Sequence, residues 1–330
     1  MSEIKGYDLA DLSILVSYYN KQNYLDPLFS CLTSLLQLNG KVHIIDDGSN
    51  KDAVAALCKK VEDLAPELRI NLNLSFQANM GSSATRNLLL DSVNTPYFIF
   101  LDADDRVNPS VLRDCLNMFR CSKADCLISP LSEAENTFPF PKLQEKAVLF
   151  QTQNKNEIYR ALGYWRIIYR KASFDNFAIR FLPGVNTVNF KNFILDDVLF
   201  LIRFSSKINE ILLAPRQFSF YIYNSQPFSQ ESRASYRRQE SIMPLAVNYY
   251  LDFYSRRGLE ISDAERRMLW ENLNSCYRDL TPKSKLKFLL RFARSTIAVT
   301  RSVTPRENVF MLLRRIALLL KALIQSLHIF

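Results

Sequence analysis

Three carboxylates stand within four positions at the end of the apolar stretch "FIFLDADD", namely Asp102, Asp104 and Asp105. Isolated charge is costly in a buried strand, so carboxylates in this place need solvent, partners or a ligand. A D-x-D pair supplies the hard oxygen ligands that divalent cations prefer, and such a cation also binds diphosphate oxygens. We therefore expect a metal or nucleotide site at Asp102 and Asp104. For Asp105 and Asn108 we favour the plainer interpretation, a solvated turn in which one of them caps the helix that starts at Pro109.

A second carboxylate pair lies in "IIDDGSN". Asp46 and Asp47 are followed by Gly48, which permits a tight turn, and by Ser49, which can cap the next helix. Carboxylates on such a turn can hydrogen-bond a nucleobase or a ribose. A capped turn without any ligand explains the stretch equally well.

The stretch "QANMGSSATRN" is the third candidate. Gly81 would let the backbone approach a ligand closely, and Arg86 follows one turn inside a helix whose N-terminus favours anions. An exposed arginine on a helix is commonplace. Its place one strand before the D-x-D pair is what favours a binding role.

These stretches follow alternating strand-like and helix-like segments. The strand-like ones are residues 12–18, 41–46, 69–76 and 97–102, and the helix-like ones are 24–40, 51–64 and 82–93. Such alternation predicts an α/β fold with a mainly parallel sheet and helices on both faces. In sheets of this kind ligands bind beyond the carboxyl ends of the strands, so we expect the polar strand ends to meet on one rim.

Beyond Leu131 the alternation weakens. We read "YWRIIYRKASF" as a strand pair or a strand and turn, "NFILDDVLFLIRF" as a loop and helix, and "KINEILLAPRQFSFYIYN" as strands. From about Arg237 the pattern is helical. We therefore predict a catalytic domain over 1–235, with a nucleotide half at about 10–130 and an acceptor half at 131–235, and a helical region over 236–330.

The composition sets limits on the function. Hydrophobic residues make up 48% of the 330 residues, which is typical of a globular protein. Six cysteines without paired spacing read as reduced core thiols of a cytosolic protein. Because the first residues are acidic and polar, we expect no signal peptide. The sequence contains no uncharged bilayer-length run, and neither a dinucleotide nor a P-loop glycine motif. With only His43 and His328 available, we expect no histidine-based metal site or triad, and we place His43 in the core or rim.

The net charge of +9 is carried by the last quarter of the chain. Residues 1–255 contain 27 basic and 27 acidic side chains, whereas residues 256–330 contain 15 basic and 6 acidic ones. "KSKLKFLLRFARSTIAVTR" and "RENVFMLLRRIALLLKALIQSLHIF" are basic amphipathic patterns typical of helices on anionic membranes. Packing of the same helices on the catalytic domain is the alternative. Nucleic acid is not expected as a partner, because no binding fold is recognisable.

Four motifs in this order, "ILVSYYN", "IIDDGSN", "NMGSSATRN" and "FIFLDADD", resemble the nucleotide-sugar half of the family 2 glycosyltransferases with the GT-A fold, over residues 12–120. The resemblance implies a GT-A type, Rossmann-like sheet and a bound nucleotide sugar, usually a uridine diphosphate sugar. It implies that base, ribose and diphosphate are held by the Tyr19-Asn20 turn, Asp46 or Asp47, Asn79 and Arg86. It also implies that Asp102 and Asp104 engage ribose and Mg²⁺ or Mn²⁺, with Asp104 as the direct ligand.

The downstream segments resemble the acceptor side of that family more loosely. Its Glu-Asp pair ahead of a helix appears here as Asp196-Asp197, which makes Asp197 the general base and leaves the role of the shorter Asp196 in substrate binding open. A plain N-cap pair is the alternative.

Taken together, the motifs and the family resemblance predict an inverting, metal-assisted glycosyltransferase. We expect it at the inner face of a bacterial membrane, where it would act on a glycan or lipid-linked acceptor of surface polysaccharide synthesis. Two alternatives are a haloacid-dehalogenase-type phosphatase, whose D-x-D strand is similar, and a membrane-bound scaffold without catalysis.

Overall fold

In the computed structural model of the chain, the described residues are 8–130, 147–151, 163–176, 179–182, 195–215, 217–222, 250 and 253–269. The chain divides into two compact units, one formed by residues 1–189 and 207–226 and the other by residues 190–206 and 227–330. Most of the predicted basic helical region lies outside the described residues.

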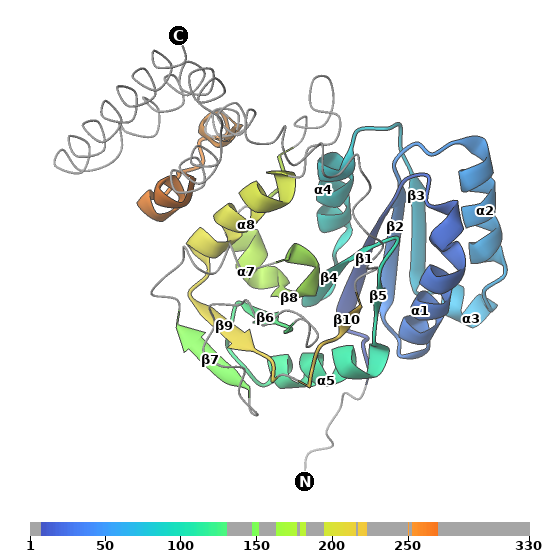
Figure 1. Ribbon diagram of the computed structural model, residues 1–330, viewed down its shortest axis with the longest axis horizontal. Coiled ribbons are helices and arrows are strands. Elements are labelled where there is room, and N and C mark those ends of the chain that lie inside the picture. Colours follow the sequence, from blue (N-terminus) through green and yellow to red (C-terminus); the bar gives the residue numbers. More distant parts are fainter. Residues whose placement is uncertain are drawn as a thin grey trace, which may run out of the picture. The chain divides into compact units, whose positions relative to one another are not determined.

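The first unit is built on an eight-stranded sheet of order β3-β2-β1-β4-β8-β6-β9-β7 within the described ranges (Figure 1). Its first four members in that order are mutually parallel, β8 is antiparallel to its neighbours, β6 and β9 are parallel, and β7 is antiparallel. The bounds are β1 Leu12–Tyr18, β2 Lys41–Asp46, β3 Leu72–Phe76, β4 Tyr97–Asp102, β6 Cys126–Ile128, β7 Val148–Gln151, β8 Ile167–Arg170 and β9 Glu210–Leu213. A separate antiparallel pair joins β5 (Arg106–Val107) to β10 (Tyr221–Ile222). The predicted mainly parallel α/β sheet is confirmed.

Helices cover both faces of the parallel strands. α1 and α5 pack on one face with α2 beside α1, while α4 packs on the other face against β1 and β2. The helices of this unit are η1 Gln22–Tyr24, α1 Leu25–Gln37, α2 Lys51–Glu62, α3 Pro66–Arg69, α4 Ser82–Ser92, α5 Pro109–Arg120, η2 Tyr164–Arg166 and α7 Lys171–Asn176, and α8 spans Leu195–Lys207. The strands and helices predicted up to residue 102 are all present, although β3 begins three residues later than expected because α3 occupies the start of that segment.

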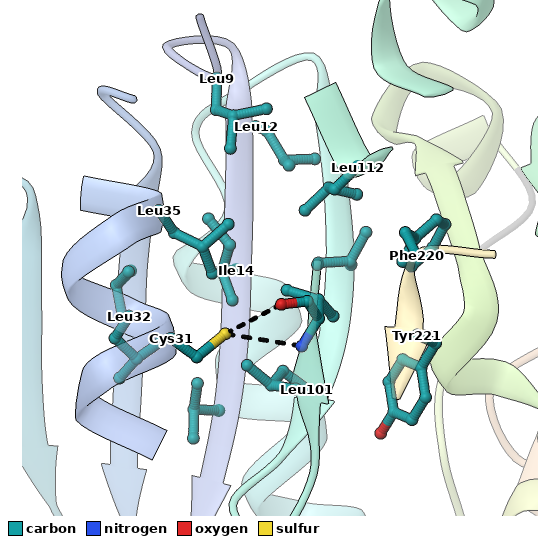
Figure 2. Packing of buried hydrophobic residues seen from close by; sticks show 14 of the residues in the cluster. Leu9, Leu12, Ile14, Cys31, Leu32, Leu35, Leu101, Leu112, Phe220 and Tyr221 are labelled. Carbon is teal, nitrogen blue, oxygen red and sulfur yellow. Dashed lines mark hydrogen bonds between the residues drawn. The ribbon is translucent and has the colours of Figure 1, made fainter. Parts of the chain in front are cut away.

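Alternate residues of each central strand face opposite layers, since both faces are buried. On one face, Ile14 and Leu101 pack against Leu32 and Leu35 of α1 (Figure 2). Figure 2 also shows the Cys31 thiol between the backbone N–H and C=O of Val107, at 3.5 and 3.4 Å. Burial raises the pKa of this thiol, in keeping with a reduced core cysteine.

The opposite face of β4 carries an aromatic cluster. Phe98 stacks on Tyr169 of β8, with ring centroids 4.9 Å apart, and meets Phe174 of α7 edge-on at 5.2 Å. The stretch "YWRIIYRKASF", predicted as a strand pair or a strand and turn, forms the short helix η2, the strand β8 and the start of α7, which places Phe174 on the sheet. His43 is also buried on this face, as expected, with Nε2 at 3.3 Å from the Ser13 hydroxyl.

The second unit contains most of α8. Arg203 of this helix donates to the Glu265 carboxylate at 2.7 Å, with both side chains almost fully buried, and its guanidinium lies 4.4 Å from the Tyr254 ring centroid. None of the helices in the described part of the chain combines the length and the apolar character that a membrane crossing needs.

Candidate active site

The ends of the four parallel strands lie side by side at one rim of the sheet. Tyr18 is in register with Asp46, Asp46 with Phe76, and Ser17 with Asp102. The polar stretches that follow these strands therefore meet, as the alternation predicted.

The turn after β1 is tied to the turn after β2. Asn20 has a positive φ of 50°, and its N–H donates to the Ser49 hydroxyl at 2.8 Å. Its side-chain oxygen accepts from the Asn50 N–H at 2.9 Å. Asn50 rather than Ser49 caps α2, with its side chain accepting from Ala53 N–H at 2.9 Å, so the predicted capping role of Ser49 is wrong. Tyr19 is exposed beside this junction.

Asp47 fixes the loop that precedes α4. One of its oxygens accepts from Gln77 Nε2 and from Met80 N–H, at 2.6 and 2.8 Å, and the other accepts from Gly81 N–H at 2.9 Å. A carboxylate with three donors is satisfied without a ligand. Asp47 thus holds the backbone of the loop in which Asn79 is exposed.

Asp46, unlike Asp47, is a carboxylate whose hydrogen-bonding capacity is only partly used. Its side chain is 2% exposed, and one oxygen accepts from Ser49 N–H at 3.1 Å. The other oxygen is buried and has no hydrogen-bond partner among the described residues. A buried acceptor without a donor costs free energy, which a ligand N–H or O–H can recover. Burial first, and the Asp46 charge second, raise the pKa of neighbouring Tyr18 to about 12.

Asp102 is held by two side chains from other segments. The Tyr164 hydroxyl, from η2, lies 2.8 and 2.9 Å from its two oxygens and accepts from Arg86 Nη2 at 2.6 Å. Arg86 also lies 3.5 Å from Asp102 Oδ1 and 4.7 Å from the Tyr164 ring centroid. Two predicted site residues, Arg86 and Asp102, are therefore brought together by a tyrosine that the motifs did not indicate.

Asp105 lies inside the protein rather than in a solvated turn. It is 4% exposed and accepts from the Tyr221 hydroxyl of β10 at 2.5 Å. Burial, then the charges of Asp102 and Asp105, raise the pKa of Tyr221 well above its usual value, so this phenol remains a donor. The helix cap is Asn108, whose side chain accepts from Val111 N–H at 3.3 Å. The prediction for Asn108 is confirmed, and that of a solvated Asp105 is wrong.

Asp104 faces the rim with its side chain 31% exposed and forms an ion pair with Lys21 Nζ. Its hard, anionic oxygens fit a divalent cation that also binds substrate phosphates, because such cations need few protein ligands. Asp102 fits less well, since both of its oxygens already face Tyr164. Within the described ranges no group of three or more His, Cys, Asp or Glu could hold a metal ion.

Asp196 and Asp197 lie in the first turn of α8, which belongs to the second unit, and Asp197 is partly exposed. Their predicted roles at the rim of the first unit remain predictions.

Sequence reasoning missed Lys21, Tyr164 and Tyr221. Lys21 directly follows the Tyr19-Asn20 turn, and this was the one available signal. The two tyrosines begin segments that resemble the acceptor side of the family, but they lie 62 and 116 positions from their carboxylate partners, and the resemblance gave them no role at the D-x-D region.

A mainly parallel sheet flanked by helices, with carboxylates, an arginine and a buried unsatisfied acceptor gathered at its carboxyl rim, is the architecture of an α/β protein of the GT-A type. The family model described as "Glycosyl transferase family 2" matches residues 13–182. This chain belongs to that family.

Curated relatives and solved structures agree with this membership. The teichoic acid poly(glycerol phosphate) polymerase of Staphylococcus epidermidis is 29% identical over 199 residues, which cover 58% of this chain and 26% of that protein. The uncharacterized glycosyltransferase YibD of Escherichia coli is 30% identical over 149 residues, 42% of this chain and 41% of that protein. The chain thus spans between about a quarter and two fifths of these relatives.

Among solved structures, Staphylococcus aureus TarS 1-349 in complex with UDP-GlcNAc has a TM-score of 0.65 at 19% identity, covering 94% of this chain and 89% of that one. The mannosyltransferase PcManGT of Pyrobaculum calidifontis, in complex with GDP-Man and Mn²⁺, has a TM-score of 0.53 at 11% identity, covering 94% and 80%. At these identities the likeness establishes the shared GT-A fold.

Proposed function

We propose that the protein transfers a sugar from a nucleotide diphosphate sugar, of which a UDP-sugar is favoured, to a hydroxyl of a glycan or lipid-linked acceptor. The observation that carries the proposal is the buried Asp46 oxygen without a donor, at a rim that also gathers Arg86, Asp102 and Asp104. The imide N–H of a uracil would satisfy that oxygen. Family membership and the UDP-GlcNAc bound to the TarS structure support the donor class.

The donor's parts are assigned to the rim as follows. Asp46, with the Tyr19-Asn20 turn and Asn79, holds base and ribose, while Asp47 keeps the loop before α4 in place. Arg86 and Asp102, held through Tyr164, face the ribose and diphosphate. Mg²⁺ or Mn²⁺ held by Asp104 would supply positive charge to the departing diphosphate.

Asp197 is assigned as the general base, with Asp196 beside it on the acceptor side. Its carboxylate accepts the proton of the acceptor hydroxyl while that oxygen bonds to the anomeric carbon. The bond from this carbon to the diphosphate oxygen breaks, and its electron pair leaves with the nucleoside diphosphate. Attack opposite the leaving group inverts the anomeric configuration, by the logic of inverting hydrolases with an alcohol in place of water.

Transfer assays with a panel of nucleotide sugars and Mg²⁺ or Mn²⁺ test the proposal. We expect Asp104→Ala and Asp197→Asn each to lower kcat/KM by roughly 10²-fold or more, the scale of a general base or of transition-state charge stabilisation. Binding of UDP should survive in Asp197→Asn. Unchanged activity in both variants would overturn the site assignment.

The two alternative functions, a phosphatase and a non-catalytic scaffold, predict different results with the same protein. A phosphatase would form an aspartyl-phosphate on Asp102, and membership of glycosyl transferase family 2 speaks against it. A non-catalytic scaffold would bind liposomes without binding any nucleotide sugar. Similarity to a bacterial teichoic acid poly(glycerol phosphate) polymerase favours a place in surface polysaccharide synthesis, at the inner face of the membrane, with the basic residues 256–330 on anionic lipid.

A further inference from the structure

The three carboxylates of the D-x-D region have different partners. Asp102 and Asp105 receive tyrosine hydroxyls, from Tyr164 and Tyr221, and both tyrosines are buried. Asp104 instead pairs with the ammonium of Lys21, and both side chains keep about a third of their surface exposed, at 38% for Lys21 and 31% for Asp104. Asp102 also pairs with Arg86, whose side chain is only 12% exposed, so the Lys21–Asp104 pair is the one of the two whose cation is open to solvent.

Lys21 is hydrogen-bonded at its backbone, whereas its ammonium contacts Asp104 and lies 5.2 Å from the ring centroid of Tyr24. The preceding Asn20 is fixed by Ser49 and Asn50, and the Lys21 carbonyl accepts from Tyr24 N–H at 2.9 Å. A lysine carries its charge at the end of a flexible four-carbon stem, so the ammonium can leave Asp104 while the backbone stays in place.

We propose that Lys21 is a displaceable counter-ion of Asp104, which competes with the divalent cation for this carboxylate and leaves when the cation binds. The inference rests on the proposed function, in which Asp104 ligates that cation. A divalent cation and an ammonium group on the same carboxylate repel each other strongly, so metal binding at Asp104 disfavours the Lys21 pair and drives the ammonium away. Lys21 thereby sets the metal affinity of the rim and neutralises Asp104 while no metal is bound.

Binding of Mn²⁺ to the chain of 330 residues in the presence of UDP tests this, measured by the electron paramagnetic resonance signal of free Mn²⁺. Lys21→Met removes the charge and keeps the length of the side chain, and we expect about two- to fivefold tighter Mn²⁺ binding, the scale of a partly exposed ion pair. Lys21→Arg keeps the competing charge and should bind Mn²⁺ as the parent does. Lys60→Met is the matched control, because Lys60 pairs with Asp26 on the helices α2 and α1.

The Asp104→Asn background separates competition from an indirect effect. Without the carboxylate, Mn²⁺ binding should weaken, and Lys21→Met should then change nothing further. A merely structural ion pair would lower the melting temperature in Lys21→Met and leave the Mn²⁺ affinity as it was.

Three results would overturn the inference: equal or weaker Mn²⁺ binding in Lys21→Met, the same gain in Lys60→Met, or no Mn²⁺ binding by any variant. Calorimetry with UDP and the transfer assay report on the proposed function separately. If sugar transfer is retained and the Mn²⁺ affinity does not depend on Lys21, this inference alone is wrong. If the parent protein neither binds UDP nor transfers a sugar, the proposed function is wrong.

Discussion

The Tyr164 hydroxyl joins two predicted site residues, and its removal tests whether it positions them. In Tyr164→Phe, the charged side chains of Asp102 and Arg86 each lose their hydrogen bond to the Tyr164 hydroxyl, worth roughly 1.5–3 kcal/mol. We expect the KM for the nucleotide sugar to rise about tenfold or more, with a smaller change in kcat, because the donor-binding geometry loosens. Steady-state kinetics with the donor varied, and then the acceptor varied, measure the split.

Tyr97→Phe is the control for this prediction. Tyr97 is a buried tyrosine at the start of β4, the strand that ends at Asp102, and its hydroxyl accepts from Arg170 at 3.2 Å. It should lose stability without a change in donor KM. Equal KM values in Tyr164→Phe and the parent would show that the Asp102 contact is only structural.

At the scale of the elements, the turn between β2 and α2 is built for close approach to the loop before α4. Gly48 has φ +72°, and a Cβ added there would meet Asn79 N at 2.5 Å. Gly48→Ala should therefore displace the loop that Asp47 holds, weakening both stability and UDP binding. Denaturant unfolding and UDP calorimetry measure the two effects.

The chain offers a matched control for the glycine prediction. Gly258 has φ +64°, but an added Cβ would meet no atom within 4 Å. Gly258→Ala should cost only the strain of a left-handed alanine, about 1–2 kcal/mol, and leave UDP binding as it was. If the two variants lost the same stability and both bound UDP normally, the close approach at Gly48 would be unimportant.

The helices and strands, and the polar rim at the ends of the parallel strands, were predictable because each depends on the local sequence pattern. Short β-branched runs, helical spacing and polar strand ends fix where β1, β2 and β4 stop, and parallel strands then bring their ends together. The partners of the carboxylates were not predictable. Tyr221 contacts Asp105 only because β10 pairs with β5. Asn50 rather than Ser49 caps α2, because the Ser49 hydroxyl accepts a hydrogen bond from the Asn20 N–H.

At the scale of the whole molecule, α8 connects the proposed base to the C-terminal residues. Most of this helix belongs to the unit that contains residues 227–330, so the predicted domain of residues 1–235 would separate α8 from its partners. One of them, Glu265, accepts from Arg203 at 2.7 Å and from the Tyr250 hydroxyl at 2.5 Å, and its other oxygen accepts from Ser262 N–H at 2.9 Å. The Ser262 and Glu265 side chains form a capping box for the helix that follows.

Glu265→Ala should therefore destabilise the second unit by about 3–5 kcal/mol, because it leaves the Arg203 charge buried and unpaired by this carboxylate. We expect kcat to fall, since α8 carries Asp197, the proposed general base, and UDP affinity to stay close to that of the parent, since the residues proposed to bind the donor lie in the first unit. Glu260→Gln is the control, because Glu260 is exposed and contacts Arg203 through its backbone carbonyl. Thermal unfolding, UDP calorimetry and transfer rates measure these effects. A loss of UDP binding equal to the loss of kcat would contradict the proposal that donor binding depends on the first unit and base catalysis on the second.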